Sequence, residues 1–202
     1  MSDMSALELD ALQEIFNVGV GRAAASLSQL TNETISMSVP VIHMLSPQGA
    51  SEFLDPHHDR ILTCISQTFS GSFSGNALLI FPSVNSLEIV RLMLGSEMPL
   101  EQLSEVEQDA MCEIGNIILN ACFSTIGGML SEHFCCQLPV LKAGYISDIL
   151  NQTSPNKQVL IVQIQMGLEK HNIEGFLAFL LENQSAECLH QAIKQFLTKV
   201  EA

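Results

Sequence analysis

Residues 10–40 run DALQEIFNVGVGRAAASLSQLTNETISMSVP, and residues 109–139 run DAMCEIGNIILNACFSTIGGMLSEHFCCQLP. Both stretches follow the pattern D-x₃-E-x₂-N-x₂₂-P, so that Asp10, Glu14, Asn17 and Pro40 recur, each at an offset of 99, as Asp109, Glu113, Asn116 and Pro139. Further along, GNALLIFP from Gly75 is followed by GFLAFLLE from Gly175 at an offset of 100. The sequence therefore predicts two copies of one unit, residues 1–98 and 99–202, which together form one compact domain.

The two units have the same expected order of elements. Helical periodicity opens them at 5–30 and 102–132, and Ser104 with Glu107 has the spacing of a capping box. Strand patterns follow at 34–44, 60–69 and 74–82, and again at 137–146, 158–167 and 173–181. A last helix is expected at 83–95 and at 184–200, and the segments SPQGASEFLDPHHD and SDILNQTSPNK are rich in turn residues. This order predicts an α+β fold of helices and antiparallel strands with pseudo-twofold symmetry.

The acid and amide residues of each motif share one side of its predicted helix. At about 100° per residue, Asp10, Glu14 and Asn17 lie within about 60° of one another, and Asp109, Glu113 and Asn116 repeat this phase. The solvated face of an amphipathic helix explains any single trio of this kind. However, the residues between the shared positions differ widely between the two copies, so the repetition favours a functional site. The second face is expected to add Asn120 and Phe123, where the first has Gly21 and Ala24.

Composition excludes several classes of partner. The chain has 202 residues, of which 47% are apolar, and its 8 basic and 22 acidic residues give a net charge of −14. Without a Lys/Arg cluster, such a surface repels nucleic acid and anionic membranes. The six Cys form no CxxC, no secretory signal opens the chain, and no unbroken apolar run has the length of a membrane span. These features predict a cytoplasmic protein with reduced thiols.

The doubled motif resembles that of the CheC phosphatases in the CheC/CheX/FliY family. Two copies in one chain are similar to CheC rather than to single-motif CheX, and the FliY architecture is not expected because no flagellar-switch extension follows residue 202. The second copy has the EIGN run common in the family, whereas the first has EIFN, with Phe16 in place of the glycine. Because Phe16 falls on the inner side of the helix, we expect altered packing and an intact site.

This resemblance implies a phosphatase that acts on the aspartyl-phosphate of a CheY-type response regulator. Asn17 and Asn116 are then expected to orient the attacking water, as a GTPase glutamine does. Glu14 and Glu113 are expected to pair with a lysine of the receiver and so dock the amide. Asp10 and Asp109 are expected to assist docking. The resemblance places Mg²⁺ in the receiver and implies no cofactor or metal of the chain's own.

Two alternative functions stay open. In the first, the chain is not a phosphatase but a non-catalytic module that binds a CheD deamidase; in the second, it is an adapter that sequesters the phosphorylated regulator. Pro40 and Pro139 are expected to shape strand entry and to take no part in chemistry. Gly19-x-Gly21 lacks the third glycine and the preceding strand of a dinucleotide site. His57, His58, Asp59 and Cys64 match no zinc spacing and are expected in or near an exposed turn.

Overall fold

The computed structural model describes residues 4–57, 59–83, 89–90, 103–151, 157–168 and 171–200. Its helices are α1 (Ala6–Thr31), α2 (Pro47–Leu54), α4 (Leu103–Leu130), α5 (Ile146–Asn151) and α6 (Asn183–Val200). Its strands are β1 (Ile35–Leu45), β2 (Leu62–Gly71), β3 (Gly75–Pro82), β4 (Phe134–Cys136), β5 (Val140–Gly144), β6 (Lys157–Leu168) and β7 (His171–Glu182). Helices together with a wholly antiparallel sheet confirm the predicted α+β class.

The strand order has an internal symmetry. The sheet runs β1-β6-β7-β3-β2-β4, and β5 also pairs with β2. With β5 taken as the edge strand beside β2, the order is β1-β6-β7-β3-β2-β5. Exchanging β1 with β5, β2 with β6 and β3 with β7 gives this same order, read from the opposite edge of the sheet. At the centre, Leu78 of β3 faces Ala178 of β7, a residue 100 positions later. This order supports the division into units 1–98 and 99–202, which stays a prediction.

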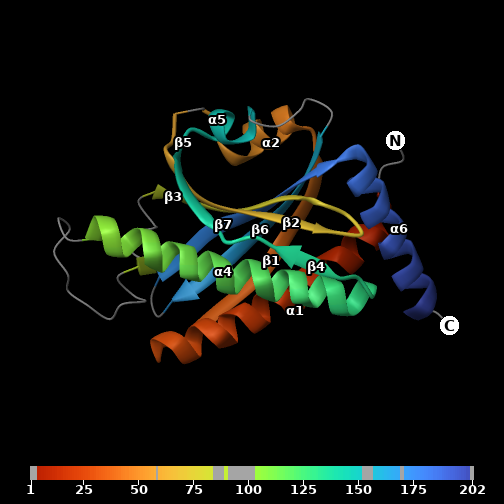
Figure 1. The fold of residues 1–202 in the computed structure, drawn as a ribbon, viewed down its shortest axis with the longest axis horizontal. Helices are drawn as coiled ribbons and strands as arrows, with labels where there is room; N and C mark the ends of the chain where they lie inside the picture. Colours follow the sequence, from red (N-terminus) through yellow and green to blue (C-terminus); the bar gives the residue numbers. More distant parts are fainter. Residues whose placement is uncertain are drawn as a thin grey trace.

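The sheet lies between two layers of helices. In Figure 1, α1 and α4 cover one face and the short helices α2 and α5 cover the other, while α6 packs at one end. Because strand side chains alternate between faces, neighbouring residues enter different cores. Leu79 belongs to the core under α1 and α4, whereas Leu78 and Ile80 belong to the core under α2 and α5. Both sheet faces are therefore apolar.

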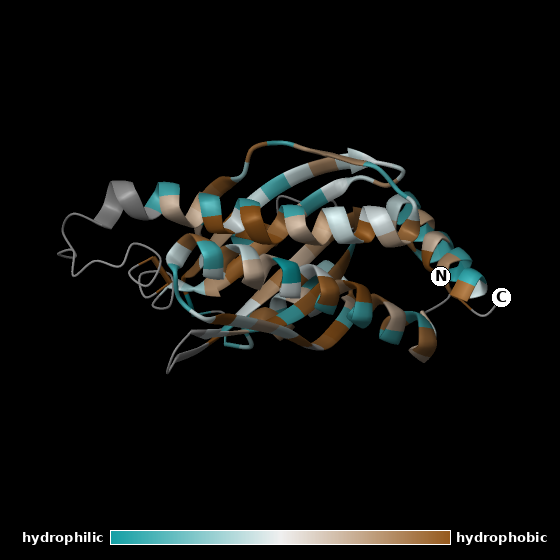
Figure 2. Cartoon of the chain, turned by 90° about the horizontal axis from the view of Figure 1, so that it is seen from below, coloured by the Kyte–Doolittle hydropathy of each residue, from teal (hydrophilic) through white to brown (hydrophobic). Residues whose placement is uncertain are grey.

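The two long helices pack closely against each other. Figure 2 views the molecule from their side and shows them next to one another, with hydrophilic and hydrophobic residues interspersed along both. A Cβ atom on Gly19 would lie 3.1 Å from the Cα of Cys122, so glycine permits the close approach. Beside this contact, Nη1 of Arg22 donates a hydrogen bond to Oγ1 of Thr125 at 3.2 Å. The glycine at position 19 therefore serves helix packing.

Four sequence-based expectations need correction or fall wholly or partly outside the described residues. The first turn-rich segment contains α2 and the second contains all of α5 except its first residue, so these connections are not plain loops. Within the expected strand 137–146, only β5 (Val140–Gly144) is a strand; a separate short strand, β4, lies before this range, and residues 137–139 are outside both. Of the expected helix 83–95, the structure describes Ser83, Ile89 and Val90, all helical. The side chains of the expected capping box at Ser104 and Glu107 lie outside the described residues.

A composition test for membrane spans selects one stretch of the described chain. Gln108–Leu130 of α4 is long and apolar enough to cross a membrane by length and composition alone, and 50% of its apolar window is buried. Core helices of folded proteins pass the same test. Since α4 packs along α1 and against the sheet, we describe it as a core helix.

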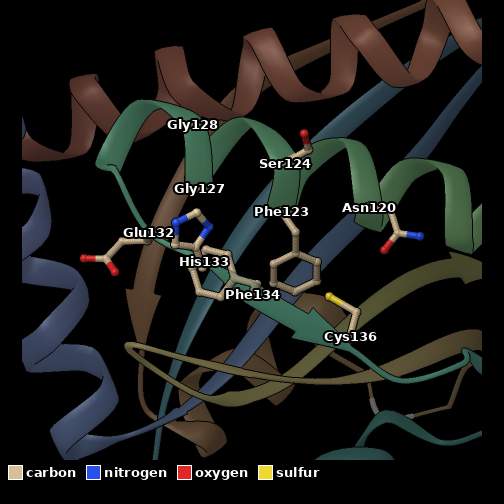
Figure 3. A pocket seen from close by; sticks show the side chains of 9 residues that line it. All are labelled: Asn120, Phe123, Ser124, Gly127, Gly128, Glu132, His133, Phe134 and Cys136. Atoms are coloured by element: carbon tan, nitrogen blue, oxygen red, sulfur yellow. The ribbon is translucent and has the colours of Figure 1, made fainter.

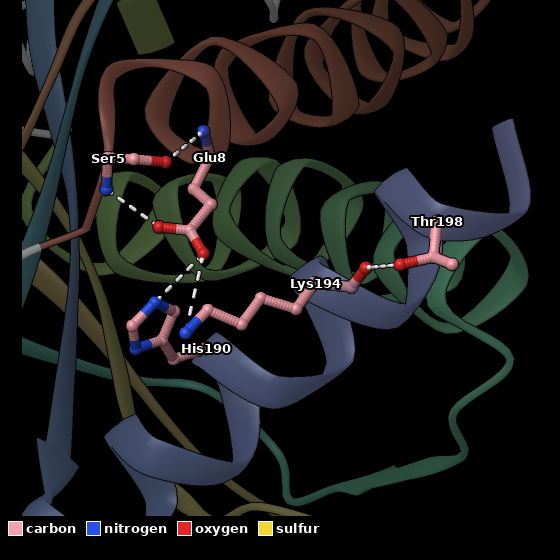
Figure 4. Close-up of polar contacts among 5 residues, drawn as sticks. All are labelled: Ser5, Glu8, His190, Lys194 and Thr198. Carbon is pink, nitrogen blue, oxygen red and sulfur yellow. Dashed lines mark hydrogen bonds and ion pairs between the residues drawn. The ribbon is translucent and has the colours of Figure 1, made fainter. Parts of the chain in front are cut away.

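A capping box at the start of α1 joins this helix to α6. The backbone N–H of Glu8 donates to Oγ of Ser5 at 3.3 Å, and the backbone N–H of Ser5 donates to Oε2 of Glu8 at 2.7 Å. The other carboxylate oxygen lies 3.0 Å from Nε2 of His190 and 3.9 Å from Nζ of Lys194 (Figure 4). Glu8 is only 5% exposed. This carboxylate therefore links the first and last helices of the chain.

The ionised form of Glu8 is expected to stabilise the fold. Burial alone would raise the pKa of this carboxyl, but the hydrogen bonds from Ser5 and the nearby His190 outweigh burial and hold the pKa below 4.5. A lowered pKa gives stability that is present above pH 4.5 and is lost as the pH falls through the folded-state value. We expect Glu8→Gln to reduce the free energy of unfolding by about 1–2 kcal/mol near pH 7, and by less near pH 3.5.

Urea unfolding of Glu8→Gln and the unchanged protein at both pH values measures this effect. Glu33→Gln, at an exposed position near the end of α1, is the control and should change stability little at either pH. A Glu8→Gln penalty of the same size at both pH values would contradict the assigned role of the charge.

Candidate active site

The first motif lies on the outer side of α1. Asp10 and Glu14 are exposed, and Asn17 is half-buried. Oδ1 of Asn17 accepts a hydrogen bond from the backbone N–H of Val39 at 2.9 Å, beside the irregularity in β1 between Ser38 and Val41. A backbone N–H can only donate, so this contact fixes which end of the amide is oxygen. The side-chain NH₂ of Asn17 therefore has no partner among the described residues.

A second amide strengthens the contact between α1 and β1. Nε2 of Gln13 donates to the carbonyl oxygen of Val39 at 2.9 Å. Val39 is only 2% exposed, and Gln13 and Asn17 together satisfy both of its backbone hydrogen-bonding groups. The strand that follows the motif helix thus holds the motif amide in place.

The second motif lies on α4 and is anchored differently. Asp109 and Glu113 are exposed, and Asn116 is half-buried. Oδ1 of Asn116 accepts a hydrogen bond from Nδ2 of Asn120, one turn later on the helix, at 2.7 Å. Both motifs therefore have an asparagine whose oxygen is held and whose NH₂ has no partner in the described chain.

The segments that end the two motifs also differ. The position of Val39 corresponds to Leu138, at an offset of 99. Leu138 lies outside β4 and β5 and is 86% exposed, whereas Val39 is in β1 and buried. Pro139 follows directly and lies just before β5, as a strand-entry proline does. The second site is therefore flanked by an exposed apolar side chain that the first site lacks.

The four motif carboxylates are available to a partner. Within the described part of the chain, Asp10, Glu14, Asp109 and Glu113 make no hydrogen bond or ion pair. Burial raises the pKa of the nearby Cys112 thiol, and the charge of Asp109 raises it further, so this thiol stays protonated. With a net charge of −14, the chain favours a cationic group at these exposed carboxylates.

Packing explains the different residues within EIFN and EIGN. Phe16 is 1% exposed, and its ring lies 5.3 Å from that of Phe179. At the matching position, a Cβ atom on Gly115 would lie 2.5 Å from Cγ2 of Ile65, so α4 approaches the sheet too closely for any side chain. The expected change in packing is confirmed.

The expectation for two further residues was wrong. Ala24 and Phe123 were expected beside the motif residues on the outer face, but both are buried. The ring of Phe123 packs 4.8 Å from that of Phe69 in the core. Gly21 and Asn120, in contrast, are exposed as expected. Asn120 is therefore the residue that distinguishes the second face from the first.

The remaining polar clusters have structural explanations. No three His, Cys, Asp or Glu side chains of the described residues gather as a metal site. His57 and Asp59 are exposed, whereas Cys64 is buried in β2, where burial raises its pKa to about 12; His58 lies outside the description. Asp55, fully buried, accepts hydrogen bonds from the backbone N–H and Nε of Arg60 and closes this turn. All six cysteines are free thiols.

Comparisons with known proteins agree with the motif and the fold. The model of the CheC-like family matches residues 7–44. CheY-P phosphatase CheC of Bacillus subtilis is 23% identical over 148 residues, which cover 72% of this chain and 70% of that protein. Flagellar motor switch phosphatase FliY of the same organism is 25% identical over 135 residues, 65% of this chain but only 34% of FliY.

The solved structures contain the same fold. The crystal structure of Thermotoga maritima FliY aligns with a TM-score of 0.78 at 19% identity, covering 96% of this chain and all of the FliY chain in that structure. Its similarity extends well beyond the residues that the family model matches. The chain therefore matches the CheC-like family model over residues 7–44, is homologous to CheC and FliY, and has the fold of Thermotoga maritima FliY.

Proposed function

We propose that the chain is a phosphatase that hydrolyses the aspartyl-phosphate of a CheY-type response regulator. The observation that carries this proposal is the pair of exposed Glu/Asn motifs, each with a free carboxylate and an asparagine held by its oxygen. A relative named as a CheY-P phosphatase supports the substrate class. The free thiols are consistent with the cytoplasm, where such regulators act.

Asn17 and Asn116 are assigned the orientation of the attacking water. Phosphoryl transfer in line with the leaving group depends on positioning and charge stabilisation. The NH₂ group of each asparagine donates to a phosphoryl oxygen or to the water, and the second lone pair of Oδ1 accepts from the water. Because the first lone pair is already occupied, the amide plane is fixed before the substrate arrives. No covalent intermediate on this chain is required.

Glu14 and Glu113 are assigned the docking of the receiver. Each stands one turn before its asparagine on the same exposed side of the helix. A lysine of the receiver that meets this carboxylate sets the distance between the amide and the phosphoryl group. Asp10 and Asp109 extend the same acidic edge by a further turn and add to the attraction.

Reversing the charge of Glu113 is expected to weaken binding more than catalysis. In an Asn17→Ala background, where only the second site works, we expect Glu113→Lys to raise KM about tenfold and to change kcat less than about threefold. Steady-state phosphate release over a range of phospho-receiver concentrations separates the two constants. Glu187→Lys on α6 makes the same change in net charge at an exposed position and should leave both constants nearly unchanged. A large fall in kcat at constant KM would assign Glu113 to chemistry.

We further propose that the reaction uses the Mg²⁺ of the receiver and no metal of the chain itself. The donor groups needed for a tight site are not gathered among the described residues. Phosphate release is therefore expected to stop when Mg²⁺ is withdrawn from the receiver, while the purified chain contains no stoichiometric metal by elemental analysis. A bound metal that the chain needs for activity would overturn this proposal.

The function itself is tested by phosphate release from a panel of phosphorylated receiver proteins. The proposal predicts faster loss of phosphate from at least one CheY-type receiver than its own spontaneous rate. A chain that binds a receiver and slows the loss is an adapter. Binding to a CheD deamidase with no effect on any receiver would favour the interaction module.

A further inference from the structure

We propose that Asn120 is a positioning residue of the second site, which holds the Asn116 side chain by its oxygen and presents its NH₂ to the substrate. The inference rests on the proposed function of Asn116. What it adds is a hydrogen-bonded relay of three side-chain amides, which runs from the buried Gln67 of the sheet through Asn120 to Asn116.

The relay begins at Gln67 in β2, a residue that is only 1% exposed. Nε2 of Gln67 donates to the backbone carbonyl of Gln137 at 2.9 Å. A carbonyl can only accept, so this contact fixes the orientation of the buried amide. Oε1 of Gln67 has no hydrogen-bond partner within the described structure. Retaining such a buried polar group is costly, which favours a role for the side chain beyond packing.

Asn120 connects the buried amide of Gln67 to Asn116. Nε2 of Gln67 also approaches Oδ1 of Asn120 at 3.5 Å, a long contact. With its oxygen turned toward Gln67, Asn120 directs Nδ2 toward Asn116 and donates to Oδ1 of Asn116 at 2.7 Å. All three amides are thereby aligned oxygen to nitrogen. The alignment leaves the NH₂ of Asn116 as the end of the relay that has no partner among the described residues.

In the first site, too, the oxygen of the motif asparagine accepts a hydrogen bond, but from a different kind of donor. There, the backbone N–H of Val39 donates to Oδ1 of Asn17. The residue that matches Asn120 is Gly21, which has no side chain and no neighbour within 4 Å of an added Cβ. In the second copy, the break between β4 and β5 places Leu138, the counterpart of Val39, outside the strands. Asn120 supplies the donor that a continuous strand supplies in the first copy.

Figure 3 shows the surroundings of Asn120, the middle residue of the relay. Asn120 is at one end of an open hollow between α4 and β4, next to Phe123 and Cys136. Water reaches this side of α4, so the Asn116 amide would sample other orientations without a fixed neighbour. Removing the one exposed hydrogen bond from Asn120 to Asn116 is therefore expected to lower the rate a few-fold and not to abolish it.

The test measures kcat and KM of the second site alone, in an Asn17→Ala background. Asn120→Ala and Asn120→Asp both remove the donor, and Asp keeps the size of the side chain. Each is expected to lower kcat about three- to tenfold with KM within about twofold. Ser124→Ala, on the next exposed turn of α4, is the matched control and should change neither constant. Gly21→Asn in an Asn116→Ala background should also leave the first site unchanged, since Val39 already holds Asn17.

A readout without substrate accompanies the kinetics. In ¹⁵N-resolved NMR spectra, the side-chain NH₂ signals of Asn116 should move in Asn120→Ala and stay in place in Ser124→Ala. An unchanged kcat with unmoved signals, or a raised KM at constant kcat, would overturn the positioning role. Failure of the proposed function is seen separately, as phosphate release in the presence of the unchanged chain that is no faster than the spontaneous rate of the receiver.

Discussion

Replacing both Asn17 and Asn116 with alanine is expected to lower phosphate release at saturating phospho-receiver by about 10²–10³-fold. This range corresponds to the roughly 2–4 kcal/mol that one well-placed polar group contributes in a transition state. Asn17→Ala and Asn116→Ala alone should each leave measurable activity, because each motif has its own exposed carboxylate and its own held amide. The measurement is phosphate released per chain for the three variants and the unchanged protein.

Two outcomes would change the account of the two sites. If one single substitution abolishes release, the other motif is a duplicated relic. If the double variant keeps full activity, the asparagines do not orient the water and other residues of the chain carry the catalysis. Gln29→Ala, at an exposed position near the end of α1, controls for general effects of substitution on this helix and should keep normal activity.

Phe16→Ala is expected to reduce the free energy of unfolding by about 3–5 kcal/mol, through lost burial and the cavity that remains. The ring is buried beneath α1, and it contacts the ring of Phe179 on β7. Gly115 has no ring to lose at the matching place, because Ile65 already occupies that space. Equilibrium unfolding in urea, followed by circular dichroism, gives the change directly.

Leu30→Ala is the control for Phe16→Ala. Leu30 lies on the same helix but is 56% exposed, so its truncation should change the free energy of unfolding by less than about 0.5 kcal/mol. Equal penalties for the two variants would show that α1 does not contribute its inner side to the core in the way described.

Periodicity made much of the fold predictable from sequence. The helical phase of Asp10, Glu14 and Asn17 predicted which side of α1 faces out, and alternation located β2, β3, β6 and β7 within two residues at either end. The short helices α2 and α5 were not expected, because eight or fewer residues rich in Ser, Pro, Asn and Asp resemble turns. The break at 137–139 was missed as well, since Pro139 is compatible with a strand entry.

The candidate site was predictable only in part. The motif residues were found from their spacing, which the repeat made specific. Their anchors were not, because the bonds from Val39 and Gln13 join residues more than 20 positions apart. Asn120 was visible as an extra amide, but its bond to Asn116 depends on side-chain rotamers that a sequence does not specify. The sequence did not mark Gln67 as a site residue, since it is one of several polar residues in a strand where polar and apolar residues alternate.

The most direct test of the central claim is the number of phosphates that each chain releases when phosphorylated CheY-type receiver is in large excess, with Mg²⁺ present. The account predicts many phosphates per chain, at a rate that rises with chain concentration. Release of no more than one phosphate per chain, or protection of the bound receiver from hydrolysis, would contradict it.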